Sequence, residues 1–493
     1  MSDRPIRIAV DVPGGDPDDR GISHEVRCLE ALSEIVHEAE GRLHILAVGD
    51  KEKIERCVPS QIFKNIETIH SPEVFPMDGT VNSHGRKETS IKTCGDLVKK
   101  GLADVLYSSG NSAGTVFNAH RLGKLAQGFS PSLVKEMPSG LTELCYVNDV
   151  GANKDSQPTD LLVSALLTKM YAQVMHGEST IPIGMFKAPV AEKAMPFFDR
   201  LQDFIGFVKP ENVYEGIPKV LALDGFMGNV YLKVVEATAR AMKDRIKKAG
   251  LWQKLFEPEA IFTHYFSPEN CCATRAQFKT STGTTYLLAS GETPSDAAAD
   301  AQNAMKHHLS KGAHVGVLSN GEESSKGNKF AQELLTNLHE TEKQNAFFHA
   351  IGFVEPKDMF EGIAKRENNT YHVNLLATDK WTAEIYSQTI LALEKALNVL
   401  ISDNYSWTNL LLRKLHLGKL YTIKKLLDPD NYGSAPVLGV DGYAVVNHGL
   451  ASRKAIKTGI LFAERYVRSG YIAEAKKAIP DIQKILSSAK IPV

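Results

Sequence analysis

The chain has 493 residues, enough for roughly two to four domains, and a composition of 43% hydrophobic and 23% charged residues excludes an intrinsically disordered protein. Its 57 basic and 58 acidic side chains nearly cancel, so the chain lacks the global positive field of a nucleic-acid-binding protein, and we expect no nucleic acid as a partner. The six cysteines form no CxxC pair and are too sparse for a disulfide framework, which is typical of a reducing compartment.

The first 145 residues alternate between short apolar runs and amphipathic segments. Each apolar run is rich in β-branched residues and ends in a turn, as buried parallel strands do. We expect strands at 6–12, 43–48 and 103–107 and helices at 25–40 and 88–100. This alternation predicts an α/β fold with a mainly parallel sheet.

The sequence predicts no targeting segment. The chain runs from Met1 into the strand at 6–12 without the charged, apolar and cleavage regions of a signal peptide. No apolar run approaches the roughly 18 residues that a membrane span needs. We therefore expect a cytoplasmic protein that does not span a membrane.

Residues 108–114, SSGNSAG, lie between the third strand and a helix that we expect to begin near Thr115. Gly110 and Gly114 allow a ligand to approach the backbone closely, and the N–H groups at a helix N-terminus attract anions. A phosphate would fit this position. An ordinary Gly/Ser turn is the alternative, because short glycine motifs recur by chance.

Residues 146–162 begin as a strand, break into a polar loop and restart as a helix, for which we expect Thr159 to be the N-cap.

Beyond this segment the chain contains a duplication. The segment 205–217, IGFVKPENVYEGI, returns at 351–363 as IGFVEPKDMFEGI, with eight of thirteen residues identical. This spacing is far longer than the repeats of about 20–50 residues that build solenoids, so a domain-sized unit has been duplicated. Two such units would form an internal pseudo-dimer.

The duplication suggests the domain organisation. We expect an outer unit at 1–145, completed by 430–493, a first middle repeat at 146–257, a linker or remnant at 258–283 and a second middle repeat at 284–429.

Two further loops place polar residues at the ends of expected strands. GEESSKGN, residues 321–328, holds two carboxylates, an ammonium group and an amide, and its alternative is a solvated loop. DGFMGN, residues 224–229, places an acid and an amide across a glycine turn, and its alternative is a strand-to-helix turn with an Asp cap.

Together these stretches resemble the motif set of the PlsX-type phosphate acyltransferases, over nearly the whole chain. The stretches are IAVDVPGGD (8–16), AVGD (47–50), RKETSI (86–91), SSGNSAG (108–114), NDVGANKDSQP (148–158), DGFMGNVYLK (224–233), NGEESSKGN (320–328) and APVLGVDGYAVVNHG (435–449). The resemblance implies a transferase that moves a long acyl group from acyl carrier protein to inorganic phosphate, giving acyl phosphate for phospholipid synthesis. It also implies a fold like that of the isocitrate and isopropylmalate dehydrogenases.

The motifs are divided between the two repeats, whereas the family order would place the GEE loop before the DGF motif within one unit. The first repeat has GMFKAPVAEK (184–193) in place of the GEE loop, and the second has TDKWTAE (378–384) in place of the DGF motif and LASGETPSD (288–296) in place of the DVGAN loop. Pro17 stands where the resemblance predicts a histidine. Each repeat has therefore lost what the other kept, which predicts one composite site per chain.

The chemistry fits these residue types. Phosphate that attacks a thioester needs an anion cradle, a cation and amide donors for the carbonyl oxygen, but no enzyme nucleophile or metal, and we expect no cofactor. The cradle would be formed by residues 110–114. We assign the cation to Lys326 and the donors to Asn229 and Asn153, with Asp224 orienting them as a member of the catalytic set.

The resemblance also implies a set of substrate-binding residues, which are Asp11, Gly14, Gly15, Ser109, Gly110, Asn111, Ser112, Asp149, Glu322, Glu323, Asn328 and His448. The acids among them orient other groups rather than act as bases, because phosphate at neutral pH is already a nucleophile. For His448 the alternative is a satisfied core histidine. In the composite site, Asn229 and Asp224 would face Lys326 and the Glu322–Glu323 loop across the pseudo-twofold interface.

Residues 404–427 have the composition of an amphipathic hairpin that lies on a membrane surface, and the resemblance places the family's membrane-seeking hairpin here. Every charged side chain in it is basic. The residues expected to touch the membrane are Trp407, Leu411, Leu412, Lys424 and Lys425. The alternative is that the leucines pack on the other repeat and the lysines are merely solvated.

We therefore expect an acyl carrier protein:phosphate acyltransferase that is peripherally bound to the membrane and acts as a monomeric pseudo-dimer. A non-catalytic scaffold descended from the same family is the first alternative, since both repeats have lost motifs. A phosphate acetyl- or butyryltransferase that uses coenzyme A is the second.

Overall fold

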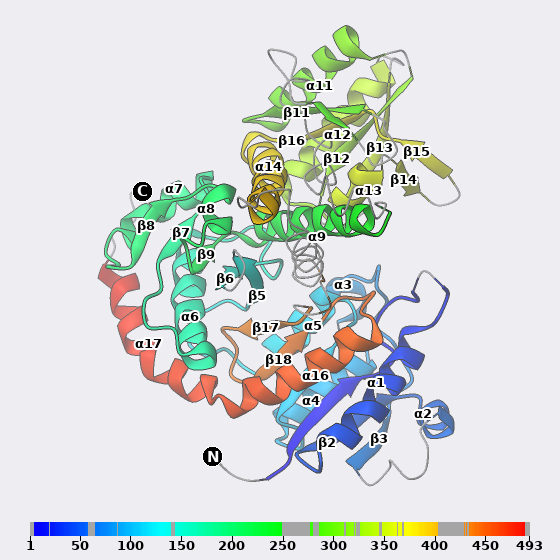
Figure 1. The fold of residues 1–493 in the computed structure, drawn as a ribbon, viewed down its shortest axis with the longest axis vertical. Coiled ribbons are helices and arrows are strands. Elements are labelled where there is room, and N and C mark those ends of the chain that lie inside the picture. Colours follow the sequence, from blue (N-terminus) through cyan, green and yellow to red (C-terminus); the bar gives the residue numbers. More distant parts are fainter. Residues whose placement is uncertain are drawn as a thin grey trace, which may run out of the picture.

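The computed structural model describes residues 4–488 apart from 19, 58–64, 86, 140–142, 249–276, 280–284, 310–311, 320, 322–325, 345–347, 362, 367–368, 403–427, 429 and 431–432. Within this part of the chain the secondary structure forms an 11-stranded sheet, a five-stranded sheet and a two-stranded ribbon. Helices cover the faces of both larger sheets (Figure 1). The α/β class and the mainly parallel sheet predicted from the sequence are confirmed.

The large sheet joins the outer unit to the first repeat. Its strands, in spatial order, are β3 (Ile66–His70), β2 (Leu43–Gly49), β1 (Ile6–Asp11), β4 (Val105–Ser108), β18 (Tyr443–Val446), β17 (Ala435–Leu438), β5 (Ser132–Ser139), β6 (Glu143–Asn148), β9 (Val220–Ala222), β7 (Ile183–Met185) and β8 (Phe204–Phe207). Strands β3 to β18 run parallel to one another, and so do β6 to β8. Antiparallel pairing of β17 with β18 and β5, and of β5 with β6, joins the two parallel halves.

The helices of the outer unit and the first repeat are α1 (His24–Glu38), α2 (Lys51–Cys57), α3 (Val81–His84), α4 (Ser90–Lys99), α5 (Ser112–His120), α6 (Pro158–His176), α7 (Pro189–Phe198), α8 (Pro210–Tyr214), α9 (Gly225–Lys248), α16 (Arg453–Arg468) and α17 (Tyr471–Ser488). Two expected helix starts are wrong. Helix α5 begins at Ser112 rather than near Thr115, because the Asn111 side chain caps it. Helix α6 is capped by Gln157, not Thr159, because Pro158 suits the first helical position and the Gln157 N–H bonds to the Asp160 carboxylate at 2.9 Å.

The second repeat forms the five-stranded sheet, in the order β10 (Gln277–Lys279), β11 (Thr285–Gly291), β16 (Leu375–Asp379), β12 (Ala313–Leu318) and β13 (Phe348–Val354). Its helices are α11 (Pro294–His308), α12 (Lys329–Gln344), α13 (Pro356–Glu361) and α14 (Lys380–Ser402), and β14 (Ile363–Arg366) pairs with β15 (Asn369–His372) in the ribbon. Strand β10 lies in the range expected to be a linker or remnant, where it pairs antiparallel with β11.

The two repeats share a local packing detail that only glycine allows. A Cβ at Gly184 of β7 would lie 2.9 Å from both γ-methyl groups of Val208, and one at Gly316 of β12 would clash with Val354. Val208 and Val354 occupy the same position in the two copies of the repeated segment. In both copies the valine of the repeated segment packs against a glycine of the neighbouring strand.

The repeats contact each other reciprocally (Figure 1). Helix α14 of the second repeat packs against α8 of the first, and α9 of the first packs against α13 of the second, while α9 and α14 also pack together. Helices α8 and α13 lie in the two copies of the repeated segment. Each repeat thus offers the same two surfaces to the other.

The long helices are shared between two hydrophobic cores. Helix α9 buries Phe226 and Val230 in the core of the second repeat and Met227 and Tyr231 in the core of the large sheet. In return, α14 buries Ile385 in the core of the large sheet. In the part of the chain that the structure describes, no helix is long and apolar enough to cross a membrane.

Candidate functional site

The loops after β1 and β4 meet at the carboxyl edge of the large sheet. The chain leaves β1 towards β2 on one side and returns to β4 on the other, and ligands of open α/β sheets bind at such a switch point. A Cβ at Gly14 would clash with Oδ2 of Asp11 and lie 3.2 Å from the Cα of Gly110. Glycine is needed here because the two loops touch.

Asp11 anchors this junction. Its carboxylate is buried and accepts hydrogen bonds from Ser90 Oγ (2.6 Å) and Ser108 Oγ (2.7 Å). Burial raises the pKa of Asp11, and the two hydroxyl groups oppose that effect by stabilising the charged form. The carboxylate thus holds the loops together and does not project into solvent.

The predicted cradle offers fewer N–H groups than its sequence suggests. The Gly110 N–H donates to Ser108 Oγ (2.9 Å) and the Gly114 N–H to Oδ1 of Asn111 (3.0 Å). Ser112 and Ala113, by contrast, are exposed at the start of α5, and no described residue accepts a hydrogen bond from their N–H groups. An anion at this edge would therefore meet the first turn of α5.

Two other side chains of the cradle are turned inwards. Nδ2 of Asn111 donates to three backbone carbonyls of residues 76–79, at distances between 2.7 and 3.2 Å. Ser109 is buried, with its hydroxyl 3.4 Å from the Tyr107 hydroxyl. Both residues shape the loop instead of facing a ligand.

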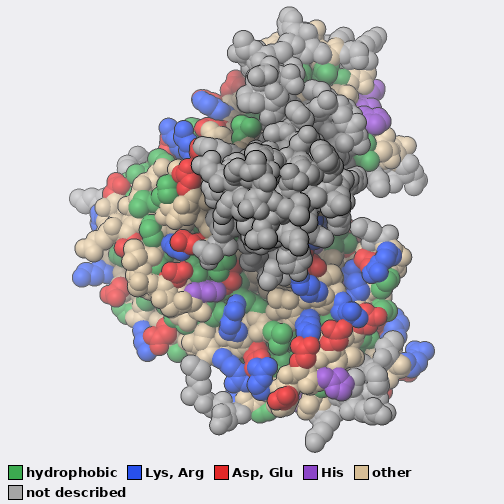
Figure 2. Space-filling model, in the orientation of Figure 1, with side chains coloured by type: hydrophobic (Ala, Val, Ile, Leu, Met, Phe, Trp, Pro, Cys, Tyr) green, Lys and Arg blue, Asp and Glu red, His purple; other side chains and the backbone are tan. Residues whose placement is uncertain are grey.

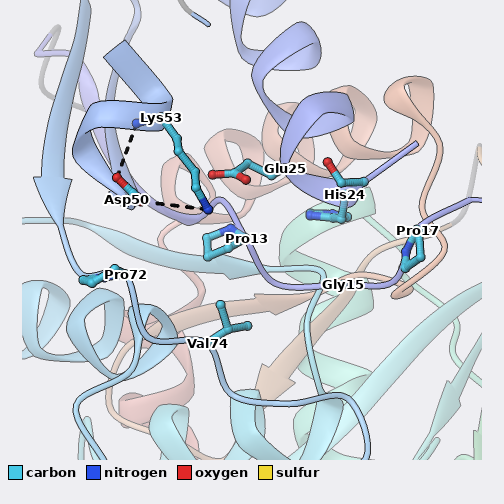
Figure 3. A pocket seen from close by; sticks show the side chains of 10 residues that line it. Pro13, Gly15, Pro17, His24, Glu25, Asp50, Lys53, Pro72 and Val74 are labelled. Carbon is cyan, nitrogen blue, oxygen red and sulfur yellow. Dashed lines mark hydrogen bonds and ion pairs between the residues drawn. The ribbon is translucent and has the colours of Figure 1, made fainter. Parts of the chain in front are cut away.

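A pocket of about 300 Å³ lies beside this junction, on the β2 side of the β1 loop (Figure 3). Gly15 belongs to its wall, and a Cβ there would lie 2.6 Å from the imidazole of His24. Two lining residues form an ion pair, with Nζ of Lys53 3.9 Å from Oδ2 of Asp50. The lining residues are Pro13, Gly15, Pro17, Ser23, His24, Glu25, Asp50, Lys53, Pro72 and Val74.

The DVGAN loop after β6 is organised by Asp149. The carboxylate accepts four backbone hydrogen bonds, from Leu133, Gly151, Ala152 and Asn153, at 2.8 to 3.1 Å. Burial raises the pKa of Asp149 to about 6, although these N–H donors oppose the rise. The Asn153 amide donates to the carbonyl of Pro131 at 2.8 Å, so its NH₂ group also supports the loop.

The N-terminus of α9 sits on that loop. Asp224 caps the helix by accepting from the N–H groups of Phe226 (3.1 Å) and Met227 (3.0 Å). Burial raises its pKa to about 6, assisted by the negative charges of Asp379 and Asp149. Asn229 donates to the carbonyl of Val150 at 3.0 Å, and its buried Oδ1 has no hydrogen-bond partner among the described residues. Asp149, Asn153, Asp224 and Asn229 therefore form one cluster.

The second repeat reaches α9 through the end of β13. Lys233, one turn after Asn229, forms an ion pair with Glu355. Burial disfavours the Glu355 carboxylate, but the ammonium groups of Lys233 and Lys357 outweigh it and lower the pKa to about 2. This pair ties the first repeat to the second at one turn from the DVGAN cluster.

The loop that carries Lys326 lies next to the end of β13. The Ser319 N–H donates to the carbonyl of Val354 at 3.0 Å, and a Cβ at Gly327 would lie 3.3 Å from the ring of Phe353. Asn328 caps α12 by accepting from the Ala331 N–H at 2.9 Å. Glu322 and Glu323 lie outside the described residues, as do the expected membrane residues Trp407, Leu411, Leu412, Lys424 and Lys425.

His448 connects the outer unit to α9. Its loop touches the β1 loop, where the Asp16 N–H donates to the carbonyl of Gly449 at 3.0 Å. His448 is exposed as a residue, and its Nδ1 accepts a hydrogen bond from the Leu450 N–H at 3.1 Å. Desolvation by the surrounding protein lowers the pKa of His448; the charge of Glu236 opposes this shift, whereas those of Lys233, Lys135 and Arg240 add to it. His448 thus lies near the charged face of α9.

Sequence reasoning missed the polar face of α9. Asn229, Lys233, Glu236 and Arg240 are spaced by four, three and four residues, which places them on one side of the helix. That spacing was readable from the sequence. Lys135, in the middle of the largely buried strand β5, was missed as well, because the sequence SLVKEMPS does not reveal that its lysine is buried.

Figure 2 shows basic and acidic side chains interspersed over the visible face of the molecule, in keeping with the balanced charge of the sequence. The described residues contain no group of three or more His, Cys, Asp or Glu side chains arranged to hold a metal ion.

The model of the family described as "Fatty acid synthesis protein" matches residues 6–261 and 301–474. A phosphate acyltransferase of Campylobacter concisus (strain 13826) is 32% identical over 253 residues, 49% of this chain and 74% of that protein. A phosphate acyltransferase of a Geobacillus species is 31% identical over 256 residues, 50% of this chain and 75% of that protein.

Among solved structures, a phosphotransacetylase from Streptococcus pyogenes is similar with a TM-score of 0.34 and 19% identity, covering 47% of this chain and 81% of that one. The family match covers well over half of the sequence and includes both repeats. The chain therefore belongs to the fatty acid synthesis protein family.

Proposed function

We propose that the chain transfers a fatty acyl group from acyl carrier protein to inorganic phosphate, giving acyl phosphate for phospholipid synthesis. Membership of the family and the likeness to phosphate acyltransferases support acyl transfer to phosphate. The observation that carries the proposal is the gathering of motifs from the outer unit and from both repeats around one helix, α9.

The proposed reaction needs charge neutralisation and donors for an oxyanion. An oxygen of phosphate attacks the carbonyl carbon of the thioester, the C–O bond forms, and the C–S bond breaks to release the carrier's thiol. The start of α5 offers N–H groups to the phosphate, and Lys326 would offset the negative charge that develops. Asn229 and Asn153 would position the carbonyl, whereas Asp149 and Asp224 keep the loops in place.

The fold proposal is an isocitrate dehydrogenase-like architecture whose duplicated middle unit forms an internal pseudo-dimer. Its support is the reciprocal packing of α8 on α14 and of α13 on α9, since an isologous contact pairs the same two surfaces twice. The composite site follows from it. Asn229 touches the DVGAN loop, Lys233 one turn later binds Glu355, and the Lys326 loop packs on the neighbouring Phe353.

The activity is tested by incubating the chain with dodecanoyl acyl carrier protein and phosphate and trapping acyl phosphate with hydroxylamine. We expect hydroxamate from this donor. Hydroxamate from short acyl-coenzyme A alone would favour the acetyl- or butyryltransferase, and no hydroxamate from any donor would favour the scaffold.

The composite site is tested with Lys326→Ala and Asn229→Ala. Each is expected to lower turnover on the order of 10²-fold or more, because each removes a group that acts on the transition state. The double variant should be less impaired than the product of the two effects, since both residues serve one reaction centre. Strictly multiplicative losses would contradict a shared site.

We further propose that residues 404–427 bind anionic membranes, because their charged side chains are all basic. Binding to phosphatidylglycerol vesicles, followed by Trp407 fluorescence, should weaken with salt and in Lys424→Glu/Lys425→Glu. Lys99→Glu/Lys100→Glu is the matched control, because it reverses two adjacent charges at the C-terminal end of α4 in the outer unit. Equal binding by both double variants would favour leucines that pack within the protein.

A further inference from the structure

Lys135 is a buried cation that the proposed mechanism does not use. Its side chain is 7% exposed, and no hydrogen bond or ion pair joins its ammonium group to a described residue. Lysine is almost never buried to this extent unless it has a partner. The surroundings of Lys135 therefore indicate what the partner is.

The side chain of Lys135 points towards α9. Successive residues of a strand point to opposite faces of the sheet. The next residue, Glu136, binds the Tyr171 hydroxyl (2.5 Å) and Nε2 of His176 (2.7 Å), and both belong to α6. Lys135 consequently projects from the opposite face, on which α9 supplies the carboxylate of Glu236 as its main attractive charge.

The polar face of α9 is fixed at both ends. Asn229 binds the carbonyl of Val150, Lys233 binds Glu355, and Lys243 binds Asp428 at 2.9 Å. Glu236 and Arg240 lie between these anchors on the same side of the helix. The charges of both residues act on His448, so this side of α9 lies near it.

Strand register places Lys135 near His448. Val437 of β17 pairs with Leu133, so continuing the antiparallel register sets Ala435 opposite Lys135, and Ala435 pairs with Val446. Lys135 and Val446 are then two strand spacings apart, roughly 10 Å, within reach of a lysine side chain and the imidazole two residues after Val446. The same row continues from Val446 to Ser108 and from Ser108 to Asp11.

The charged groups around His448 and Lys135 are more positive than negative. Lys135, Arg240 and Lys233 are the cations near His448, and Glu236 is the acid that the described residues place among them. Because Lys233 is paired with Glu355, Lys135 and Arg240 exceed Glu236 by one positive charge. An anionic ligand would be attracted to that excess.

We infer that Lys135 binds the attacking phosphate dianion beneath α9 and holds it there for transfer of the acyl group, an inference that rests on the proposed function. The ammonium group stays protonated and donates to a phosphate oxygen. Phosphate forms the new C–O bond, and the carrier's sulfur leaves with the electrons of the C–S bond. Lys135 is thus a second cation for the reaction, supplied by the large sheet, whereas Lys326 is supplied by the second repeat.

The test compares Lys135→Met, Lys135→Arg and the control Lys219→Met in the full-length chain. Lys219 is also a partly buried lysine of the large sheet region, but it is paired with Glu143 at 2.9 Å and Glu178 at 3.7 Å. Phosphate binding is measured by calorimetry without an acyl donor, and the KM for phosphate by trapping with hydroxylamine.

Lys135→Met is expected to raise both the Kd and the KM for phosphate about tenfold or more, because a hydrogen bond to a charged group is lost. The KM for the acyl donor should stay unchanged, and Lys219→Met should bind phosphate like the natural chain. Lys135→Arg should restore most of the affinity. Phosphate binding by Lys135→Met that equals the natural chain would overturn the inference, and so would an arginine variant no better than the methionine variant.

A pH profile keeps the test decisive if Lys135→Met does not fold. Burial lowers the pKa of Lys135, while Glu236 and Glu136 oppose that effect. Phosphate affinity of the natural chain should therefore fall at alkaline pH, and Lys135→Arg should retain it because arginine stays charged. Identical profiles would refute the role of Lys135.

The two proposals fail separately. If the natural chain forms no hydroxamate with any donor but still binds phosphate in a Lys135-dependent way, acyl transfer is wrong and the anion site stands. If the natural chain forms hydroxamate and its phosphate affinity does not change in Lys135→Met, the anion site is wrong and the acyltransferase proposal stands.

Discussion

Gly228 is a residue at which α9 packs directly on the DVGAN loop. A Cβ there would clash with the carbonyl oxygen of Asp149 and lie 3.4 Å from the Cα of Val150. The matching position of the second repeat, four residues after Asp379 as Gly228 is after Asp224, is Ala383. The second repeat tolerates a side chain where the first does not, in keeping with the loss of its own DVGAN loop.

Gly228→Ala should therefore destabilise the chain and abolish acyl phosphate formation. In an ordinary helix, replacing glycine by alanine stabilises the protein by about 1 kcal/mol. A loss of stability in Gly228→Ala would therefore itself indicate the clash with the DVGAN loop. Thermal unfolding and the hydroxylamine assay measure the two effects. The matched control, Ala383→Gly, should cost about 1 kcal/mol of stability and leave the assay unaffected. A Gly228→Ala chain that is more stable and fully active would show that α9 has room to move.

For individual residues, the sequence predicted where the loops lie, but it did not predict which of their polar side chains face a ligand and which bind the backbone. Glycines and polar residues after apolar strands are visible in the sequence, and they predicted the turns at 13–16, 108–114 and 148–153. Whether Asn111 or Asp149 faces a ligand depends on which carbonyls and N–H groups the fold brings near them. Asn111 binds backbone carbonyls of residues 76–79, and Asp149 accepts from Leu133 as well as from its own loop; no local pattern encodes these distant contacts.

Helix α9 and the loop before α13 are joined by the Lys233–Glu355 ion pair, in which the Glu355 side chain is 10% exposed. The pseudo-symmetric positions in α14 and before α8 hold Gln388 and Lys209, which cannot form such a pair. The two reciprocal contacts between the repeats therefore differ: the contact of α9 with the segment before α13 contains this ion pair, and the contact of α14 with the segment before α8 does not.

Glu355→Gln should lower the free energy of unfolding at pH 7 by about 2–3 kcal/mol, because it leaves Lys233 without its counter-charge. The folded pKa of about 2 lies below the ordinary value of 4.5, so the carboxylate stabilises the fold above pH 4.5. That contribution is lost as pH falls from about 4.5 towards 2. Urea unfolding at pH 7 and pH 3 should show the difference between the two chains shrinking.

Glu292→Gln is the control for this experiment. Glu292 pairs with Lys380 at 2.9 Å, but its side chain is 70% exposed, so the change should cost less than about 1 kcal/mol. An equal loss in both variants, or a difference that does not depend on pH, would show that the buried pair contributes no more than an exposed one.

At the scale of elements, the sequence revealed the duplication because thirteen residues repeat with the same spacing of apolar side chains. It also predicted most strands of the outer unit, since buried parallel strands are continuous apolar runs. It could not reveal the exchange of helices between repeats. The apolar stripe of α9 looks the same in the sequence whether it packs on its own sheet or on the other repeat. Only the structure shows that Phe226 belongs to the core of the second repeat and Met227 to the core of the large sheet.

Over the whole molecule, α9 and α14 join two hydrophobic cores that would otherwise be separate. Phe226 is 2% exposed in the second core, while Tyr231 is fully buried in the first. Opening either core exposes side chains of a helix that also belongs to the other. We therefore expect the two sheets to unfold together.

Phe226→Ala should cost about 3–5 kcal/mol, the usual effect of deleting a buried aromatic ring. Hydrogen exchange measured by mass spectrometry should show protection falling in both sheets, in β1 and β4 as well as in β12 and β16. Phe207→Ala, on the edge strand β8 with a side chain 38% exposed, should change stability by less than about 1 kcal/mol. Loss of protection confined to the second repeat would mean that the cores are independent.

The reciprocal packing of the repeats has a consequence for how activity responds to dilution. A site built by two separate subunits exists only while they are associated, so its occupancy falls with concentration by mass action. Here one covalent chain carries both repeats, and a tether of this kind keeps its ends at an effective concentration of about millimolar or more. The proposed composite site therefore predicts that specific activity stays constant on dilution to about picomolar enzyme, and a fall in specific activity on dilution would contradict it.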